Sequence, residues 1–324
     1  MKTSLSSIVQ WKFNIFVYKV LGWRMAFFYI ILLGKLYFYF KREEKRRIEE
    51  AIGTAFSDCD CNHKRKSISK NVFRGILSHY YEKLFNAHEN VERLEAFFRD
   101  NIEVGCLEKL DVALKEGKGV LFVTGHYGGI EYIPIFLALN KYPISVIAKF
   151  ATRQLKETLY SKTKDLGLRI IDAGQGTNIL GAVIEELKAN RLVFIECDEI
   201  KEWKPSRKEK MLFLGKMIGV DKTISLIQRR TGAQIIFGIL HRFTIHEYRL
   251  IIESYQDLLV GLGYTTRSVG EAILKSFEQY VYLYPEEWYQ WKNYAEIKTP
   301  SISGTGVERV SPLSLPKPAF GGAS

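Results

Sequence analysis

A histidine and a glutamate separated by four residues lie in the stretch VTGHYGGIEYIPIF, residues 123–136. A carboxylate that bonds one nitrogen of His126 would fix its tautomer and leave the other nitrogen to accept a proton, and Glu131 is the carboxylate expected to do so. The loop holds no serine or cysteine that could act as a nucleophile. The pair therefore predicts general base catalysis on a nucleophile that belongs to the substrate. The alternative is a polar loop that only caps the following helix.

Acyl transfer is the chemistry that such a base suits. An alcohol deprotonated by His126 can attack an acyl thioester directly, while backbone amides or a cation hold the oxyanion. Gly128 and Gly129 allow a sharp turn, so we expect them to expose their amides to the substrate and to bring Glu131 back towards the imidazole. Base catalysis contributes roughly 10²- to 10⁴-fold and one oxyanion donor about 10²- to 10³-fold, which together suit an activated acyl group.

The elements around this loop alternate between short apolar strands and helices of about ten residues or more. We expect strands at 119–124, 144–150, 168–173 and 191–198, with helices at 130–139, 152–167 and 178–190 between them. A hairpin-like piece, a helix at 221–232, strands at 234–243 and 248–255 and a closing helix at 267–285 follow. This pattern predicts an α/β fold with a mostly parallel central sheet flanked by helices. His126 would then lie in the crevice at the carboxyl end of the sheet.

An aromatic and apolar segment precedes this domain, and its densest part is residues 25–40. As a helix that part would extend roughly 24 Å, which is short for a membrane span. Its many aromatic residues, interspersed lysines and basic stop predict a helix that associates with a membrane, by interfacial attachment or by spanning; a core helix is the alternative. We therefore expect a membrane-anchoring segment at 1–48, a catalytic domain at 49–299 and a disordered tail at 300–324.

Composition indicates a globular protein with an anionic partner. The 47 Lys and Arg residues outnumber the 36 Asp and Glu residues, which gives a net charge of +11. The charge suits a membrane surface or an acidic carrier, and with the apolar segment we expect no nucleic acid partner. Four cysteines predict free thiols in a reducing compartment. Cys59, Cys61 and His63 lack a second Cys/His pair at zinc-site spacing, so we expect a polar loop and no metal site.

Several other motifs are absent or incomplete. Gly174, Gly176 and Gly181 follow a strand, but their spacing is not that of a dinucleotide loop, and we expect a tight turn whose helix amides could still face a phosphate. The chain has neither a P-loop nor a G-x-S-x-G elbow, which argues against the usual ATP site and against a serine hydrolase. His241 and His246 lie on or beside strands without a carboxylate pattern, and we expect strand-edge histidines there.

An ordered series of segments resembles the bacterial lipid A biosynthesis acyltransferases, the late lauroyl and myristoyl transferases of the lysophospholipid acyltransferase superfamily. The segments are GHYGGIE in the histidine loop, VIAKF at 146–150, RLVFIECDE at 191–199, the stretch 211–240 and YPEEWYQWKNY at 284–294. The aromatic N-terminal segment with its basic stop also fits, so the resemblance covers most of residues 11–295. It implies a glycerolipid acyltransferase-like fold, with a fatty acyl thioester as the donor and no cofactor.

The resemblance implies roles for individual residues. His126 corresponds to the general base and Glu131 to its partner. Lys149 stands where the family usually has arginine, which implies an oxyanion or phosphate role, and Asp198 matches the family aspartate at the substrate site. Glu199 replaces the usual Gln or His, and the closing motif ends in KNY where the family has His-Arg-Arg. These departures affect the identity of the expected acceptor more than the expected acyl-transfer reaction.

The sequence as a whole predicts a membrane-associated O-acyltransferase. It would move a fatty acyl chain from acyl carrier protein or coenzyme A to a hydroxyl of an anionic glycolipid, a lipid A precursor, at the cytoplasmic face of the bacterial inner membrane. One alternative is the same chemistry on a lysophospholipid, a phosphoinositide mannoside or an ornithine-type lipid. Another is a catalytically inactive membrane-binding protein.

Overall fold

The computed structural model describes residues 5–9, 11–57, 62–150, 153–174, 176 and 178–297. Cys59, Cys61 and the expected tail at 300–324 lie outside these residues. Cys106 and Cys197, which lie within them, are free thiols as expected.

A seven-stranded sheet forms the centre of the molecule, with the order β1-β9-β8-β2-β5-β3-β4. Neighbouring strands are parallel except for the antiparallel pair β8 and β9. The strands are β1 (Ile102–Val104), β2 (Val120–Thr124), β3 (Ile144–Ala148), β4 (Arg169–Asp172), β5 (Leu192–Glu196), β8 (Gln234–Arg242) and β9 (Tyr248–Ser254). The mostly parallel α/β sheet expected from the sequence is confirmed.

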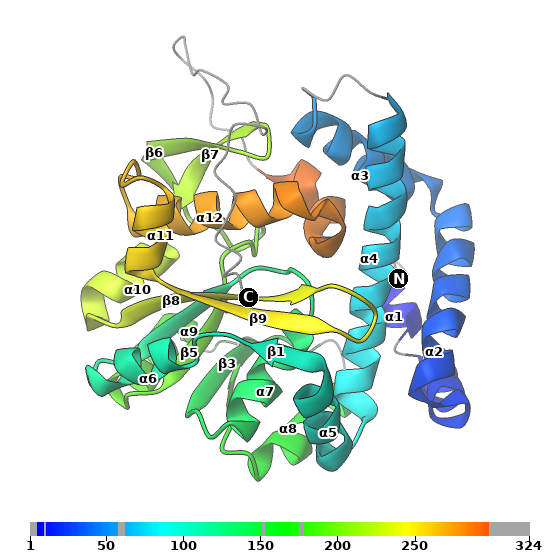
Figure 1. Ribbon diagram of the computed structural model, residues 1–324, viewed down its shortest axis with the longest axis horizontal. Helices are drawn as coiled ribbons and strands as arrows, with labels where there is room; N and C mark the ends of the chain where they lie inside the picture. The colour runs from blue at the N-terminus through cyan, green and yellow to red at the C-terminus, as the bar shows by residue number, and fades with distance from the viewer. Residues whose placement is uncertain are drawn as a thin grey trace, which may run out of the picture.

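Helices cover both faces of this sheet. Figure 1 shows α12 (Val269–Leu283) on one side and α6 (Glu108–Lys115) and α7 (Ile133–Leu139) on the other. The remaining helices around the sheet are α5 (Val91–Asn101), η1 (Ile130–Tyr132), α8 (Arg153–Lys164), α9 (Ile179–Lys188), α10 (Thr223–Thr231) and α11 (Tyr255–Gly261). Strand β2 shows why two layers form: Leu121 and Val123 enter one hydrophobic core, and Val120 and Phe122 enter the other. Side chains alternate along a strand, so a wholly apolar strand needs cover on both faces.

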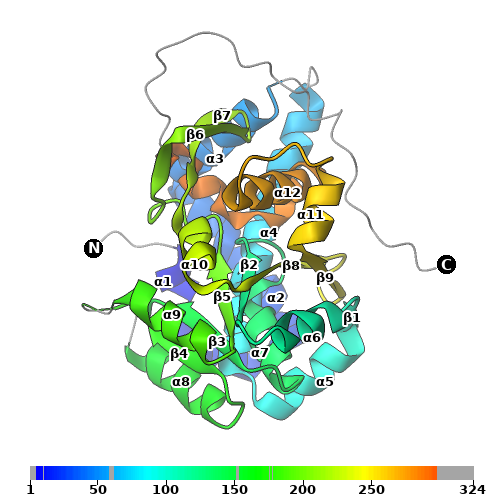
Figure 2. The same ribbon diagram turned by 90° about the vertical axis from the view of Figure 1, so that its left-hand side faces the viewer.

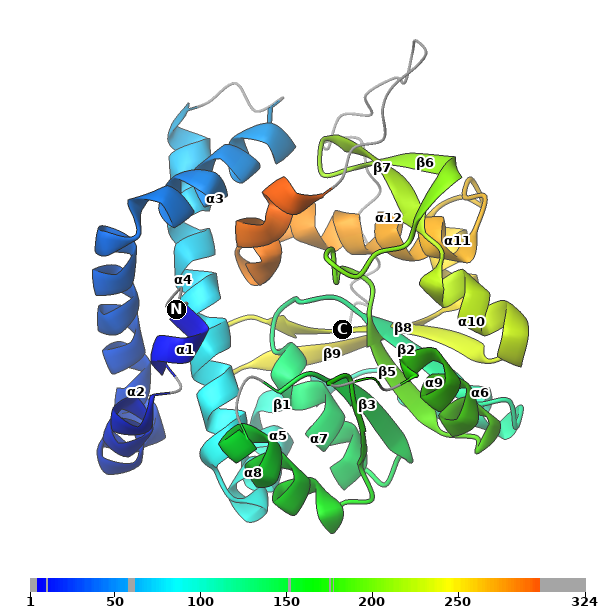
Figure 3. The same cartoon turned by 180° about the vertical axis from the view of Figure 1, so that it is seen from behind.

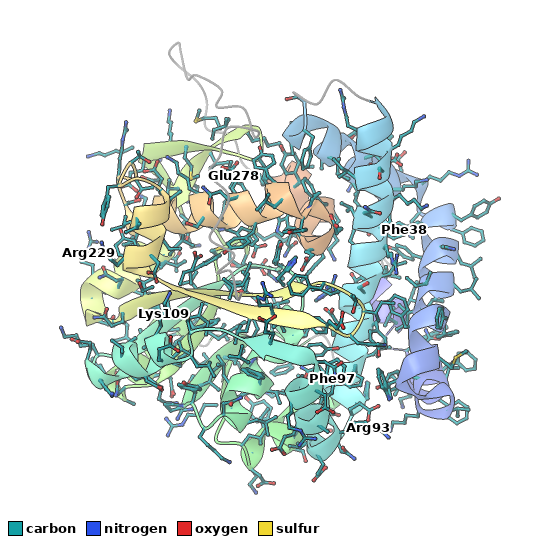
Figure 4. All side chains as sticks on the ribbon, in the orientation of Figure 1. Phe38, Arg93, Phe97, Lys109, Arg229 and Glu278 are labelled. Carbon is teal, nitrogen blue, oxygen red and sulfur yellow. The ribbon has the colours of Figure 1, made fainter. Side chains whose placement is uncertain are left out.

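Four N-terminal helices pack beyond the carboxyl ends of the parallel strands: α1 (Leu5–Val9), α2 (Lys12–Phe40), α3 (Arg42–Ala55) and α4 (Asn62–His88). Figures 1 and 3 show α2 and α4 side by side. Phe38, labelled in Figure 4, projects from α2, and its ring packs on Phe73 of α4. Gly22 has a positive φ of 72° and kinks α2. One face of α2 is therefore part of the core.

No helix in the described part of the chain is long and apolar enough to cross a membrane. The spanning form of the N-terminal helix that the sequence left open is thus not supported. Helix α2 is longer than the expected 25–40 segment, but lysines and the kink interrupt its apolar run.

A small hairpin and a closing segment complete the molecule. Strands β6 (Pro205–Phe213) and β7 (Lys216–Asp221) form the antiparallel hairpin, which lies near α12 (Figure 2). The chain then returns after α12 through η2 (Pro285–Glu287) and η3 (Tyr289–Glu296). A bridge between Tyr127 and Trp288 attaches this closing segment to the histidine loop.

Candidate active site

The register of two central strands places the site. Thr124 at the end of β2 lies beside Glu196 at the end of β5, and the two strands are parallel. His126 follows Thr124 and Asp198 follows Glu196 by two residues, so both lie just beyond the carboxyl ends of these parallel strands. The expected position of His126 at the carboxyl end of the sheet is confirmed.

Asp198 is the carboxylate that contacts the imidazole. Its Oδ1 lies 2.8 Å from His126 Nδ1, and the backbone N–H of His126 donates to both carboxylate oxygens at 3.0 Å. The indole N–H of Trp288 donates to Oδ2 at 2.7 Å. Asp198 and Trp288 are fully buried, and the Asp198 carboxylate is held by hydrogen bonds from several directions. This arrangement keeps the proton of the neutral imidazole on Nδ1 and directs the lone pair of Nε2 outwards.

Glu131 contacts other groups than the imidazole of His126. Its Oε1 accepts a hydrogen bond from Lys83 Nζ at 3.1 Å and lies 3.6 Å from His79 Nε2. The direct pairing of Glu131 with His126 expected from the sequence is therefore corrected. Glu131 lies in the 3₁₀ turn Ile130–Tyr132 that follows the loop, and Lys83 of α4 bonds its carboxylate there. The Glu131 charge raises the pKa of Lys83, which stabilises the ammonium form.

Helix α4 contributes a polar face to this site. His79, Glu82, Lys83 and Asn86 follow a three-, four- and seven-residue spacing, so they lie on one side of the helix. Asn86 donates to the backbone oxygen of Glu131 at 2.7 Å. Burial holds the pKa of His79 well below its usual range, so that side chain is neutral. Helix α4 thus fixes the position of Glu131 after the glycine turn.

The two glycine amides of the loop are already bonded. Gly128 N–H donates to the backbone carbonyl oxygen of Glu287 at 3.0 Å, and Gly129 N–H donates to the backbone carbonyl oxygen of Leu240 at 2.8 Å. The expectation that these amides face a substrate is corrected, because the closing segment and β8 use them to anchor the loop. Gly128 has a φ of 53°, the left-handed conformation that a glycine adopts without strain.

Two further carboxylates surround the outward nitrogen of the histidine. Glu196 Oε2 lies 3.7 Å and Glu199 Oε2 lies 3.8 Å from His126 Nε2. Burial lowers the pKa of His126, but the charges of Glu196, Asp198 and Glu199 outweigh it and raise that pKa to about 9. Burial in turn raises the pKa of Glu196. At neutral pH the imidazole is therefore mostly protonated.

The same three side chains have the composition of a metal site. His126 Nε2 and one oxygen each from Glu196 and Glu199 lie within 4.8 Å of one another. Nitrogen and carboxylate ligands suit Zn²⁺, and a carboxylate on the other histidine nitrogen commonly accompanies such ligation. The prediction that the chain holds no metal remains untested.

An aromatic ring covers the other side of the imidazole. Tyr289 packs edge-on against His126, with ring centroids 4.9 Å apart, and stacks on His79 at 3.6 Å. Its backbone N–H also donates to the His126 oxygen at 3.2 Å. The ring therefore restricts the directions from which a substrate can approach.

A buried ionic network bonds to the histidine loop through Arg242. The Arg242 guanidinium bonds both oxygens of Glu82, at 2.6 and 3.1 Å, and donates to the Gly128 oxygen at 3.0 Å. Glu287 accepts from the Arg242 backbone N–H at 2.8 Å and lies 2.6 Å from His241 Nδ1. His241 is thus a buried histidine with a carboxylate partner, which corrects its expected place at a strand edge. The network joins α4, β8, the loop and the closing segment.

The remaining predicted residues lie apart from these contacts. Lys149 follows β3, is exposed, and forms no hydrogen bond or ion pair within the described residues. The turn at Gly174 is held by Asp172, whose Oδ1 accepts from the Gly174 N–H at 2.8 Å, as expected of a tight turn. The Gly181 N–H is occupied by the side chain of Asn178 at 3.0 Å.

Sequence reasoning missed Glu196, Trp288, Lys83 and His79 as parts of the site. Three of them left a signal in the chain. His79 and Lys83 stand among the buried apolar positions Leu77, Tyr80, Tyr81 and Leu84 of α4, which indicates a buried polar contact. Glu196 is likewise a charged residue at the end of an apolar strand.

Comparisons with known proteins agree with this arrangement. The family model described as bacterial lipid A biosynthesis acyltransferase matches residues 4–293, which is most of the chain. The search of curated proteins finds no match to this chain. The protein therefore belongs to the bacterial lipid A biosynthesis acyltransferase family and is a lipid acyltransferase.

Proposed function

We propose that the protein is a membrane-associated O-acyltransferase. It moves a fatty acyl chain from acyl carrier protein or coenzyme A to a hydroxyl of a glycolipid of the lipid A precursor class. The observation that carries this proposal is His126, whose Nδ1 is held by Asp198 while its Nε2 forms no hydrogen bond within the described residues. Among the described residues no serine, threonine or cysteine bonds that nitrogen, which supports a base that serves the substrate.

The reaction follows from this geometry. Neutral His126 takes the proton of the acceptor hydroxyl on Nε2, and the acceptor oxygen attacks the thioester carbonyl. Asp198 stabilises the imidazolium that forms. The tetrahedral intermediate then expels the thiolate, which takes the proton back from Nε2. The products are an ester and a free thiol.

A side chain is the proposed source of oxyanion stabilisation. The amides of Gly128 and Gly129 are bonded within the protein, so they do not supply it. Lys83 is a cation held by Glu131 next to His79, and its side chain is 32% exposed, which leaves it accessible to the intermediate. Lys149, exposed after β3, is proposed to bind a phosphate of the donor.

Membrane attachment is proposed to occur through the outer face of α2. That face carries large apolar side chains that are each more than half exposed: Phe13, Phe16, Val20, Met25, Phe28, Leu32, Leu36, Tyr39 and Phe40. Exposed apolar patches of this kind mark interaction surfaces, and the basic residues at the helix ends suit anionic headgroups. We place this contact at the cytoplasmic face of the bacterial inner membrane, where both thioester donors are available.

Transfer of a labelled acyl chain from each thioester to bacterial lipid extract tests the proposal. The wild-type protein is expected to form a labelled ester lipid, and a folded His126→Ala variant is expected to lose nearly all of this activity. Equal activity of the two proteins would contradict the proposed base. Vesicle binding without consumption of either thioester would favour an inactive membrane-binding protein, and the mass of the product identifies the acceptor class.

A further inference from the structure

We propose that a basic surface on the β6–β7 hairpin docks the acyl carrier protein that delivers the fatty acyl chain. The inference rests on the proposed function, because it concerns the donor of the same reaction. It selects the acidic carrier over coenzyme A as the donor that the hairpin recognises. The basic hairpin surface consists of five exposed cations: Lys204, Arg207, Lys208, Lys210 and Lys222.

Neighbouring carboxylates do not neutralise these cations. Among the described residues none of the five forms an ion pair, whereas Lys201, just before them, is paired with Glu296 at 3.5 Å. Glu202 and Glu209 are the exposed acids in the stretch 201–210, so positive charge predominates there. Uncompensated positive charge on a surface attracts an acidic partner and accelerates its association.

A β-bulge turns the cations of β6 outwards together. The pairing register of β6 and β7 shifts between Pro205 and Lys210. The buried Ser206 hydroxyl accepts hydrogen bonds from the backbone N–H groups of Lys208 and Glu209, at 3.3 and 3.1 Å. Residues 207–210 are all exposed, although a regular strand that packs on a core would bury alternate side chains. The bulge therefore presents three cations to solvent within four residues.

The hairpin is attached directly to the residues around Asp198. The Trp203 indole N–H donates to the backbone carbonyl oxygen of Cys197 at 2.9 Å. The ring of Phe213, at the end of β6, packs edge-on against Trp203 and against Trp288, which bonds Asp198. A partner that docks on the hairpin is thus held next to the proposed site of transfer.

The basic hairpin surface lies near the proposed base but does not contact it. Lys204 follows the partly exposed Glu199 by five residues, so their Cα atoms are at most about 18 Å apart. A carrier protein presents its thioester at the end of a long flexible arm. Such a donor suits a docking surface that lies beside the reacting groups and not among them.

The proposed membrane contact lies on another side of the molecule. Figures 1 and 3 show the hairpin and α2 at opposite sides. A protein attached to a membrane through the outer face of α2 therefore turns the basic hairpin surface away from the lipid headgroups. This arrangement favours a soluble acidic partner over an anionic membrane.

The spread of the cations favours a protein over coenzyme A. Residues 204–210 extend at most about 20 Å, at roughly 3.3 Å per residue. Coenzyme A concentrates its phosphates on one nucleotide, so it can contact only part of this row. The acidic surface of a carrier protein presents several carboxylates along a comparable length, which matches the row in extent and in sign.

Charge reversal on the hairpin tests the inference. The variant Arg207→Glu/Lys208→Glu/Lys210→Glu changes three exposed side chains. Binding of acyl-loaded bacterial carrier protein is measured by calorimetry. Values of kcat/KM are measured with carrier and coenzyme A thioesters and bacterial lipid extract as the acceptor source. Circular dichroism checks that each variant is folded.

The matched control reverses three lysines elsewhere in the described part of the chain. Lys115, Lys141 and Lys164 are exposed and form no ion pair with described residues. The variant Lys115→Glu/Lys141→Glu/Lys164→Glu therefore has the same net charge as the hairpin variant. It separates the effect of the hairpin from that of the total charge.

The hairpin variant is expected to lose at least about tenfold in carrier binding and in kcat/KM with the carrier thioester, because three ion pairs at the rim of the interface become repulsive. High salt should reduce this loss, since exposed charges are screened. With the coenzyme A thioester, kcat/KM should change less than about threefold, because only long-range steering is altered. The control should resemble the wild-type protein with both donors.

The outcomes separate the docking surface from the proposed function. Unchanged carrier binding by the hairpin variant overturns the docking surface and leaves acyl transfer intact, as does a wild-type protein that uses coenzyme A thioesters without binding the carrier. An equal loss with both donors, or weaker binding to anionic vesicles alone, assigns the cations to another role and also overturns the inference. Carrier binding that depends on the three cations, without ester formation from either donor, supports the docking surface and contradicts the transferase proposal.

Discussion

Trp288 donates its indole N–H to Asp198 at 2.7 Å, across 90 residues of chain. The same carboxylate orients the imidazole of His126, so the closing segment acts on the proposed base through Asp198. A tryptophan in a P-E-x-W motif is thus a positioning residue in this chain, and Asp198 is the residue through which it acts.

Asp198→Asn is expected to lower kcat roughly 10³-fold with a smaller effect on KM, because the amide no longer enforces the productive tautomer. Glu131→Gln is the comparison, since its carboxylate contacts Lys83. We expect it to lower kcat less and to leave the pH midpoint of the reaction in place. Steady-state kinetics of both variants, measured across pH, test these expectations. A pH midpoint that shifts in Glu131→Gln alone would indicate that Glu131, and not Asp198, is the partner of the imidazole.

The pH dependence of kcat/KM follows from the charge of His126. Only the neutral imidazole accepts a proton, and the carboxylates around it raise its pKa to about 9 despite burial. Activity should therefore increase with pH, with a midpoint near 9 in the free enzyme. Glu196→Gln removes one raising charge and should lower the midpoint by roughly one pH unit. A wild-type midpoint below 7 would contradict the electrostatic account.

Gly128→Ala should prevent the loop from closing. Its φ is 53°, and a Cβ there would meet the Leu240 oxygen and lie 2.7 Å from Glu287 Oε2. We expect a loss of at least about 2 kcal/mol in the free energy of unfolding, together with lost activity. Gly117→Ala is the control, because φ is 70° and its Cβ meets nothing within 4 Å. Denaturant unfolding compares them, and equal losses would show that φ alone accounts for the effect.

Arg242→Met should destabilise the protein by about 3–5 kcal/mol, because it leaves Glu82 buried without its cation. Arg249→Met breaks the pair with Glu103 on the same sheet, where both side chains are partly exposed, and should cost less than about 1 kcal/mol. Urea unfolding measures both. The double variant Glu82→Gln/Arg242→Met should recover part of the loss, and no recovery would mean that packing outweighs charge at this position.

Replacing Phe16, Phe28 and Leu32 together by serine should weaken binding to anionic vesicles by at least about tenfold, because each exposed apolar side chain gains free energy on insertion. Val112→Ser, at another exposed apolar position on α6, is the control. Cosedimentation measures the binding. Unchanged binding of the triple variant would exclude the outer face of α2 as the membrane contact.

The fold was largely predictable because its strongest signals are local. Each central strand is a short apolar run between turns, and the closing helix has clear periodicity. Strand β1, residues Ile102–Val104, was not expected, since three residues carry no periodic signal and the strand forms by pairing with β9. Spanning of the membrane by α2 could not be decided either, because one face of that helix packs on α4.

The site was only half predictable. The types of His126 and Asp198 indicated chemistry, but the choice of carboxylate partner depends on the register that places Thr124 beside Glu196. That register joins segments about 70 residues apart and leaves no trace in local spacing. Lys83 determines the position of Glu131 for the same reason, since α4 reaches the loop only after the chain has folded.

The order of the chain also determines when the arrangement around His126 is complete. The closing segment supplies Trp288 and the Glu287 carbonyl, and both hold the histidine loop. During synthesis the base and its carboxylate leave the ribosome well before these partners. A nascent chain that ends before residue 288 therefore lacks the indole N–H that bonds Asp198.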